Sequence, residues 1–180
     1  MIKLYFEEVD SKFHSESFAR NILSRYLNVN SNSLLICKNE FGKPYLKDYP
    51  NVHYNISHTK GAIVCAVADE PVGVDIERVK NFNKRIAERF FTQNEQNYIF
   101  DKMENQNERF AEIWTMKEAY VKWLGEGMAI PFDSFDVLQI EKIYSLSHGI
   151  YYIAVFTNST LNPRAAIEHC NSLLDCTRLL

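Results

Sequence analysis

The sequence predicts an α+β fold made of two halves that share one order of elements: a strand, then helices, then strands. Apolar runs of strand length open and close each half, and segments with apolar residues three and four apart lie between them. A short polar match supports the repeat, because residues 54–58 (YNISH) and 144–148 (YSLSH) each precede an apolar, strand-like run.

The first half contains one segment with clear helical spacing, in which Phe18, Ile22 and Tyr26 recur four residues apart. Glycine and proline in FGKP mark a turn after it. The elements predicted for this half are a strand at 2–9, a helix at 14–27, a turn at 41–44 and a hairpin of 52–56 and 62–68 linked by 57–61.

The second half carries stronger boundary signals. Thr92 followed by Glu95 has the pattern of a capping box, and Gly125 and Gly127 end a long amphipathic helix. The elements predicted here are a strand at 72–76, helices at 84–91, 92–103 and 108–124, strands at 135–140 and 151–156, and a terminal helix at 165–174.

Composition narrows the class of protein. The chain has 180 residues, 46% of them hydrophobic, and a net charge of −3, which does not favour a long nucleic acid as partner. No apolar run approaches the ~20 residues of a membrane helix, and the N-terminal stretch lacks the pattern of a secretory signal. The four cysteines form no CxxC pair, which favours reduced thiols over a disulfide framework or a zinc site. We therefore expect a cytoplasmic protein with neither nucleic acid nor membrane as partner.

Two acids interrupt the apolar stretch PVGVDIERV. Residues two apart in a strand point to the same side, so Asp75 and Glu77 are predicted to share a face. Carboxylates this close repel one another, and if half-buried they need a cation, either a basic side chain or Mg²⁺. By itself, such a pair is better explained by a strand with one solvated face.

A second group of polar residues lies in the long helix, in the stretch WTMKEAYVK. Trp114, Glu118 and Lys122 are four residues apart and share one face. They form either a core aromatic with a surface ion pair worth about 0.3–0.5 kcal/mol, or a third metal ligand beside a phosphate contact. Lys117 points about a quarter-turn away.

A third group is made of phosphate-binding side chains. Lys43 lies in the FGKP turn, and Ser57 and His58 follow a predicted strand. Each alone is explained as a turn residue. Together with three acids, they suit a metal-bridged polyphosphate.

Five motifs in order, GKP, NISH, VGVDIE, FFTQNE and WTMKEA, resemble the 4′-phosphopantetheinyl transferase superfamily, in its two-lobed, surfactin-synthetase-activating type. The resemblance covers residues 40–130 well. It implies a pseudo-twofold pair of lobes, each a small, mainly antiparallel sheet packed with helices, with the active site in the cleft between them. We expect an N-terminal lobe at 1–70, a C-terminal lobe at 71–160 and a tail at 161–180, in one monomeric chain that makes its own cleft.

The resemblance also implies an activity of the holo-[acyl-carrier-protein] synthase type. The 4′-phosphopantetheine group of coenzyme A would pass to a serine hydroxyl of an apo acyl or peptidyl carrier protein, with release of adenosine 3′,5′-bisphosphate. By motif match, the metal is Mg²⁺ and its ligands are Asp75, Glu77 and Glu118. Glu118, or a metal-bound water that it positions, would accept the serine proton. The contacts to coenzyme A are Lys43, Ser57, His58 and Lys122.

The chain departs from the family pattern in its N-terminal part, where about forty residues precede FGKP and no arginine follows His14-Ser15. This leaves open how adenine and the 3′-phosphate are held. Two other functions also stay open: a degenerate module that binds a carrier or nucleotide without turnover, and another Mg²⁺-dependent phosphoryl or nucleotidyl enzyme. The sequence lacks the GxxxxGK[ST] phosphate loop, which excludes the commonest version of such a phosphoryl or nucleotidyl enzyme.

Overall fold

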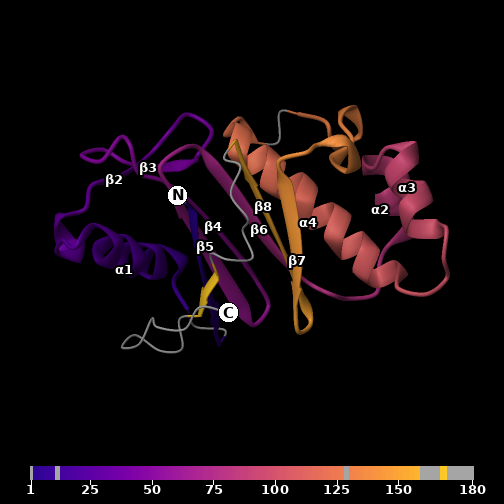
Figure 1. Ribbon diagram of the computed structural model, residues 1–180, viewed down its shortest axis with the longest axis horizontal. Coiled ribbons are helices and arrows are strands. Elements are labelled where there is room, and N and C mark those ends of the chain that lie inside the picture. Colours follow the sequence, from indigo (N-terminus) through magenta and orange to yellow (C-terminus); the bar gives the residue numbers. More distant parts are fainter. Residues whose placement is uncertain (1, 11–12, 128–129, 159–166, 170–180) are drawn as a thin grey trace.

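The computed structural model describes residues 2–10, 13–127, 130–158 and 167–169 (Figure 1). The elements of its first half are β1 (Ile2–Glu8), α1 (Ser15–Leu27), β2 (Ile36–Lys38), β3 (Pro44–Leu46), β4 (His53–Thr59) and β5 (Ala62–Ala68). Those of the second half are β6 (Val72–Arg78), α2 (Lys84–Phe90), α3 (Gln93–Phe100), α4 (Gln106–Leu124), β7 (Ile143–His148) and β8 (Tyr151–Thr157), followed by β9 (Ile167–His169).

The two halves repeat one topology. In the first sheet the order is β4-β5-β1-β9, and in the second it is β6-β8-β7. Each half closes with an antiparallel hairpin, β4–β5 or β7–β8, whose second strand pairs antiparallel with the strand that opened that half, β1 or β6. The predicted α+β pair of lobes with small, mainly antiparallel sheets is therefore confirmed.

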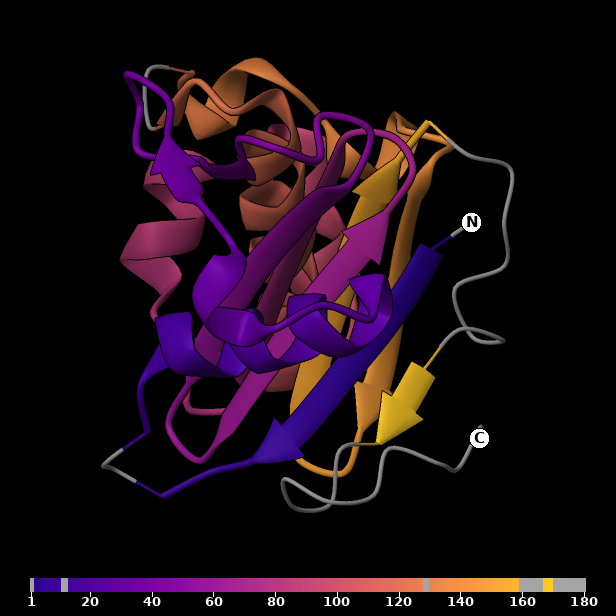
Figure 2. The same cartoon turned by 90° about the vertical axis from the view of Figure 1, so that its left-hand side faces the viewer.

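The layers are a helix, two sheets and a group of helices. Helix α1 crosses the outer face of the first sheet, as Figure 2 shows, and buries Ile22 and Leu23 against Cys65 and Val67. Helix α4 covers the outer face of the second sheet, with α2 and α3 beyond it (Figure 1). A third apolar cluster fills the space between the sheets and draws on strands of both halves. Covered on both faces, β5 buries all seven of its residues, which explains the unbroken apolar run AIVCAVA.

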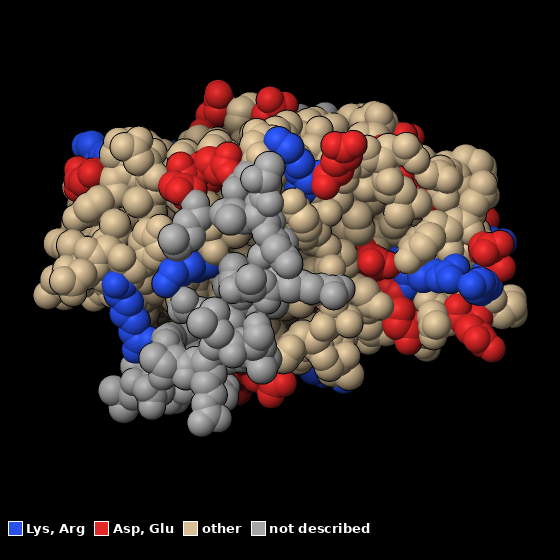
Figure 3. Space-filling model, in the orientation of Figure 1, with Lys and Arg blue, Asp and Glu red and all other residues tan. Residues whose placement is uncertain are grey.

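The surface and the helices add two observations. Acidic and basic side chains are interspersed on the face shown in Figure 3. Among the helices that the structure describes, none has both the length and the apolarity to cross a membrane.

Strand β4 is longer than predicted. It continues through Ser57 and His58 to Thr59, so the hairpin link is the tight turn at Lys60 and Gly61, not residues 57–61. Gly61 has a left-handed backbone, with φ of +90°, which a residue without Cβ adopts freely. Ser57 therefore belongs to the strand and to its alternation of faces.

The predicted strand at 135–140 is wrong. This segment forms short 3₁₀ turns, and the strand follows at Ile143–His148. Side chains replace a strand ladder here: Glu95 accepts from the Val137 amide at 2.8 Å, and Asp136 accepts from the Leu138 amide at 3.0 Å. Because these backbone groups are already satisfied, the segment has no need of a neighbouring strand.

The predicted terminal helix at 165–174 is also wrong over residues 167–169. Residues Ile167–His169 form a strand that pairs parallel with Leu4–Phe6 on the outer edge of β1. An edge strand offers unpaired amides and carbonyls, and a short added strand satisfies some of them. The other residues of 165–174 lie outside the described residues.

Candidate active site

Strands β4 and β6 lie side by side where the two halves meet, although they belong to different sheets. The links between them use side chains. Asn55 accepts from the Val74 amide at 3.0 Å, Ser57 donates to Asp75 at 2.6 Å, and Thr59 donates to Glu77 at 3.4 Å. The partners advance in the same direction along both strands, so the two run parallel. We call this contact between β4 and β6 the seam.

The alternation of each strand brings these partners together. Asn55, Ser57 and Thr59 occupy alternate positions of β4, and Asp75 and Glu77 occupy alternate positions of β6. The prediction that Asp75 and Glu77 share a face is confirmed by their bonds to Ser57 and Thr59 on the same neighbouring strand.

Helix α4 reaches the seam because Gly73 lets it approach the strand closely. A Cβ atom at Gly73 would lie 2.0 Å from the Ala119 carbonyl oxygen and 2.5 Å from the Trp123 amide nitrogen. The helix backbone therefore rests directly on β6, which only glycine permits. Glu118 and Lys122, one turn apart on α4, are carried to the seam by this approach.

Lys122, Asp75 and Ser57 meet in one cluster. The Lys122 ammonium donates to Asp75 Oδ1 at 2.6 Å and to Ser57 Oγ at 2.8 Å, while Ser57 Oγ itself donates to Asp75 Oδ1. Asp75 is only 4% exposed. Its other oxygen, Oδ2, is buried and has no hydrogen-bond partner among the described residues. A buried, unpaired carboxylate oxygen is costly and indicates a place for a further cation or donor.

Burial and the negative charge of Asp75 raise the pKa of two nearby carboxylates, Glu118 and Glu77. Burial raises the pKa of Glu118, and repulsion from Asp75 and Glu77 raises it further, against the opposing effect of Lys122. Burial likewise raises the pKa of Glu77, with Asp75 adding to the shift and Lys80 opposing it. The three acids thus lie near enough to repel one another, which is the condition that a bound cation relieves.

The side chains as they stand do not form a finished metal site. Within the described part of the chain, no group of three or more His, Cys, Asp or Glu residues is placed to hold a metal ion. Asp75 instead contacts the ammonium of Lys122. The structure therefore brings Asp75, Ser57 and Lys122 into contact and places Glu77 and Glu118 around them.

Lys43 and His58, the other two predicted contacts, lie apart from this cluster. The Lys43 ammonium donates to the Trp123 carbonyl at the end of α4, at 2.8 Å, and burial lowers its pKa to about 8. His58 is exposed, and its ring lies edge-on to Phe13 with centroids 5.1 Å apart. The structure does not join either residue to Asp75.

A cavity lies at each end of the seam. One, of about 380 Å³, is lined by Lys43, His53, Pro71 and Trp123, among others, at the start of β4 and β6. The other, of about 140 Å³, is lined by Glu77 with Arg78, Ile86, Phe110 and Trp114, among others, at the end of β6.

Sequence reasoning missed Asn55 and Thr59, which complete the seam. Their signal was the alternation N-x-S-x-T in YNISHT, which matches the alternation D-x-E on the facing strand. The signal carries weight only once the two strands are known to be neighbours.

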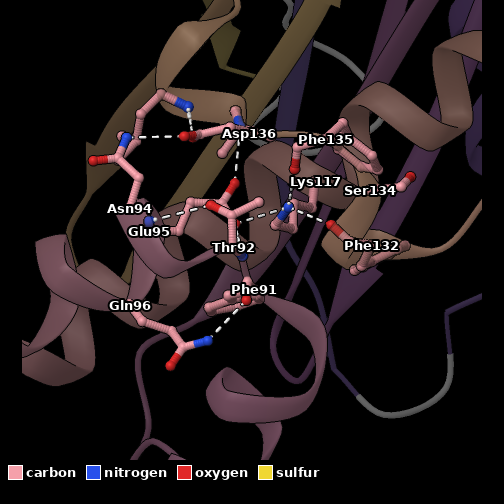
Figure 4. Close-up of polar contacts among 12 residues, drawn as sticks. Phe91, Thr92, Asn94, Glu95, Gln96, Lys117, Phe132, Ser134, Phe135 and Asp136 are labelled. Atoms are coloured by element: carbon pink, nitrogen blue, oxygen red, sulfur yellow. Dashed lines mark hydrogen bonds and ion pairs between the residues drawn. The ribbon is translucent and has the colours of Figure 1, made fainter.

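Lys117 plays no part in the seam. Its ammonium donates to Glu95 at 2.9 Å and to the carbonyls of Phe132 and Phe135 at 2.6 and 2.7 Å (Figure 4). The capping box predicted for Thr92 and Glu95 is confirmed, and Glu95 is fully buried within it. This pair anchors the segment after α4 to the start of α3.

Comparison with known proteins gives the seam a context. Residues 71–159 match the model of the 4′-phosphopantetheinyl transferase superfamily. The chain is 44% identical over 121 residues to the 4′-phosphopantetheinyl transferase gsp of Aneurinibacillus migulanus, covering 67% of this chain and 50% of that protein. It is 33% identical over 132 residues to the 4′-phosphopantetheinyl transferase Sfp of Bacillus subtilis (strain 168), covering 73% and 59%.

A solved structure also matches: the holo-[acyl-carrier-protein] synthase of Thermotoga maritima, at 20% identity and a TM-score of 0.36, over 47% of this chain and 60% of that one. The chain spans between half and three-fifths of the length of gsp and Sfp. The matched family region contains β6, α4 and the acids of the seam, and two relatives are 44% and 33% identical over longer alignments. The chain therefore belongs to the 4′-phosphopantetheinyl transferase superfamily.

Proposed function

We propose that the chain transfers the 4′-phosphopantetheine group of coenzyme A to a serine hydroxyl of an apo acyl or peptidyl carrier protein. The observation that carries this proposal is the meeting of Lys122, Asp75 and Ser57 across the seam, beside Glu77 and Glu118. Acidic and basic groups that converge on one point suit a substrate whose phosphates are bridged by a metal ion. The names of the relatives support the same reaction.

Mg²⁺ is the metal we propose, with Asp75, Glu77 and Glu118 as its ligands. The unpaired Oδ2 of Asp75 and the mutual repulsion of the three acids fit this ion, which prefers carboxylate oxygens. When bound, it would neutralise charge on the diphosphate of coenzyme A. Lys122, which contacts Asp75 in the structure, is placed to shift its ammonium towards a phosphate oxygen.

The reaction that we propose has one bond-forming and one bond-breaking event. The carrier serine oxygen attacks the phosphorus that bears the pantetheine group, and the bond from this phosphorus to the bridging oxygen breaks. Glu118 accepts the serine proton, a general-base role that carboxylates serve in enzymes. Lys122 stabilises the charge that develops on the leaving adenosine 3′,5′-bisphosphate.

The two cavities support an orientation for the substrates. Lys43 lines the larger cavity, so we assign the nucleotide to this end of the seam. Lys43 would leave the Trp123 carbonyl to bind a phosphate. Ser57, which contacts Lys122 in the middle of the seam, is a further proposed contact to the phosphates. His58 lies beyond Ser57 towards the other end of β4, so its proposed contact requires coenzyme A to extend along the seam. An in-line displacement needs the acceptor opposite the leaving group, so we place the serine towards Glu77.

The setting we propose is one chain acting as a monomer in the cytoplasm. Both strands of the seam come from the same chain, so a second copy is not needed to complete the site. Cys37 and Cys65 are free thiols, which suits a reducing compartment.

A mass measurement tests the function. The chain is incubated with coenzyme A, Mg²⁺ and a panel of apo carriers from fatty-acid, polyketide and peptide synthesis, and each carrier is then weighed. A gain of one phosphopantetheine on a carrier supports the transferase and identifies the carrier class. Binding of carrier or coenzyme A without a gain would instead support the non-catalytic module.

A further inference from the structure

The turn between β2 and β3 contacts the end of α4, in the other half of the molecule. Asn39 donates through Nδ2 to the Gly125 carbonyl at 3.1 Å, and Lys43 donates to the Trp123 carbonyl at 2.8 Å. The contact is close, because a Cβ atom at Gly125 would lie 2.9 Å from Lys43 Cδ. These bonds join residues 86 and 80 positions apart in the sequence.

Asn39 is held firmly by its own turn. Its side-chain oxygen accepts from the Phe41 amide at 3.0 Å and from the Lys43 amide at 2.8 Å, while its backbone pairs with Lys43 and Gly42. Two amide donors on Oδ1 determine which end of the side chain is oxygen, so the NH₂ group must face α4. One side chain therefore both organises the turn and reaches across to the helix.

The end of a helix needs such donors. The last carbonyls of an α-helix have no partner within the helix, and here the residue after the helix, Gly125, turns left-handed with φ of 75°. The donors come from a different part of the chain, so the cap also connects the two halves. Lys122 lies in this last turn, immediately before Trp123.

Lys43 has a second partner under the proposed function, besides the end of α4. Under the proposed function, its ammonium moves to a phosphate when coenzyme A binds, and the bond from Asn39 to Gly125 then remains. We propose that Asn39 is a positioning residue that holds the last turn of α4 in place, so that Lys122 keeps its contacts at the seam while the nucleotide is bound. This inference rests on the proposed function.

Two substitutions separate the acceptor role of Asn39 Oδ1 from the donor role of its Nδ2 group. Asn39→Asp keeps an acceptor oxygen for the turn and removes the donor to Gly125, whereas Asn39→Ala removes both. Asn30→Ala is the matched control, because Asn30 accepts from the Asn32 amide at 2.8 Å in a similar turn and caps the 3₁₀ helix Ser31–Ser33, with no bond to α4 among those described for it.

The first readout needs no substrate. Amide hydrogen exchange of residues 121–125 in the free chain should accelerate about tenfold in both Asn39 variants, as loss of one net hydrogen bond implies, and stay unchanged in Asn30→Ala. The second readout is steady-state transfer. We expect kcat to fall about tenfold in Asn39→Asp while KM for coenzyme A stays within about twofold, because an interaction that acts during the chemical step is lost.

Each outcome decides something. Exchange and kcat at wild-type values in Asn39→Asp would reduce Asn39 to a turn residue and overturn the proposal, as would faster exchange with unchanged kcat. If the wild-type chain modifies no carrier, the proposed function has failed and the positioning role falls with it. The exchange data would still decide whether Asn39 caps α4, so the two failures are distinguishable.

Discussion

Helix α4 carries two lysine–carboxylate pairs that differ in how completely they are satisfied. In the pair of Lys117 and Glu95, both side chains are 0% exposed, and the ammonium makes three bonds to oxygens. In the pair of Lys122 and Asp75, the lysine is 28% exposed and one carboxylate oxygen has no described partner. The first pair uses its full bonding capacity in the fold, whereas the second keeps capacity for a ligand. Charged groups of the same kind, a few residues apart on one helix, thus divide into a pair that the fold satisfies fully and a pair that we propose to act in function.

The largest effect should come from breaking the pair of Lys117 and Glu95, which we call the closed pair because its bonds are all made within the fold. Lys117→Met leaves Glu95 charged and buried without its partner, so we expect a loss of about 3–5 kcal/mol in the free energy of unfolding, measured in urea. Lys84→Met, which breaks the exposed pair with Glu88, should cost less than about 1 kcal/mol. Adding Glu95→Gln to Lys117→Met should restore part of the loss. A cost below 1 kcal/mol for Lys117→Met would show that the closed pair is not structural.

The pair of Lys122 and Asp75, which we call the open pair, depends on the close approach of α4 at Gly73. A methyl group at Gly73 should therefore cause the second-largest loss of stability. Gly73→Ala forces α4 away from β6, because the added atom would lie 2.0 Å from the Ala119 oxygen, and we expect a loss of about 3 kcal/mol by thermal or urea unfolding. Gly149→Ala is the control: it meets no atom within 4 Å and carries only the cost of a left-handed backbone, about 1–2 kcal/mol. Equal losses in the two variants would contradict the direct packing of α4 on β6.

Glu118→Gln should separate activity from stability at the open pair. Loss of the proposed ligand and proton acceptor should lower transfer by at least about 100-fold in the carrier assay. The fold should be retained and slightly more stable at neutral pH, because a carboxylate repelled by Asp75 becomes neutral. Glu108→Gln, in the first turn of the same helix, should leave transfer unchanged. Near-normal turnover in Glu118→Gln would refute its role.

Lys43→Ala should affect binding more than chemistry. We expect KM for coenzyme A to rise about tenfold with a smaller change in kcat, because a phosphate contact is lost while Asn39 still holds α4. Since the pKa of Lys43 is lowered to about 8, KM in the unmodified chain should also rise as the pH passes that value and the ammonium loses its proton. Lys84→Ala, on α2 and outside the lining of this cavity, is the control. An unchanged KM in Lys43→Ala would remove Lys43 from the nucleotide site.

The smallest expected effect is a pH dependence of stability. The pKa values of Glu77 and Glu118 are raised above 4.5 in the folded chain, so protonation favours the fold. This contribution is complete below pH 4.5 and is lost as the pH rises through the folded-state values. In urea unfolding with EDTA, the free energy of unfolding should therefore decline as the pH rises. The decline should be weaker in the Glu77→Gln/Glu118→Gln double variant, and Mg²⁺ should reduce it. An identical decline in the double variant would assign it to other groups.

Local patterns predicted the parts of the site that depend on local geometry. The two-residue alternation placed Asp75 and Glu77 on one face, the four-residue spacing placed Glu118 with Lys122, and the capping box placed Glu95. The five motifs then predicted the family.

Contacts between distant segments decided what the sequence could not predict. No backbone ladder joins β4 to β6, so the sequence of either strand alone does not predict that Ser57 faces Asp75. The segment at 135–140 has the composition of a strand, yet Lys117 and Glu95, remote in sequence, bond to one of its carbonyls and one of its amides. Lys43 was predicted from its motif, and its bond to Trp123 depends on how the hairpin meets α4.

The apolar cluster between the two sheets has a consequence for how the molecule can move. Leu4, Phe6 and Val64 from the first half pack in it with Val74 and Ile153 from the second. Separating the halves would expose this layer to water, so we expect no hinge between them and a single cooperative unfolding transition. A substrate would then bind in cavities of nearly constant size, and its fit would be adjusted by side chains such as Lys43 and Lys122 rather than by domain closure.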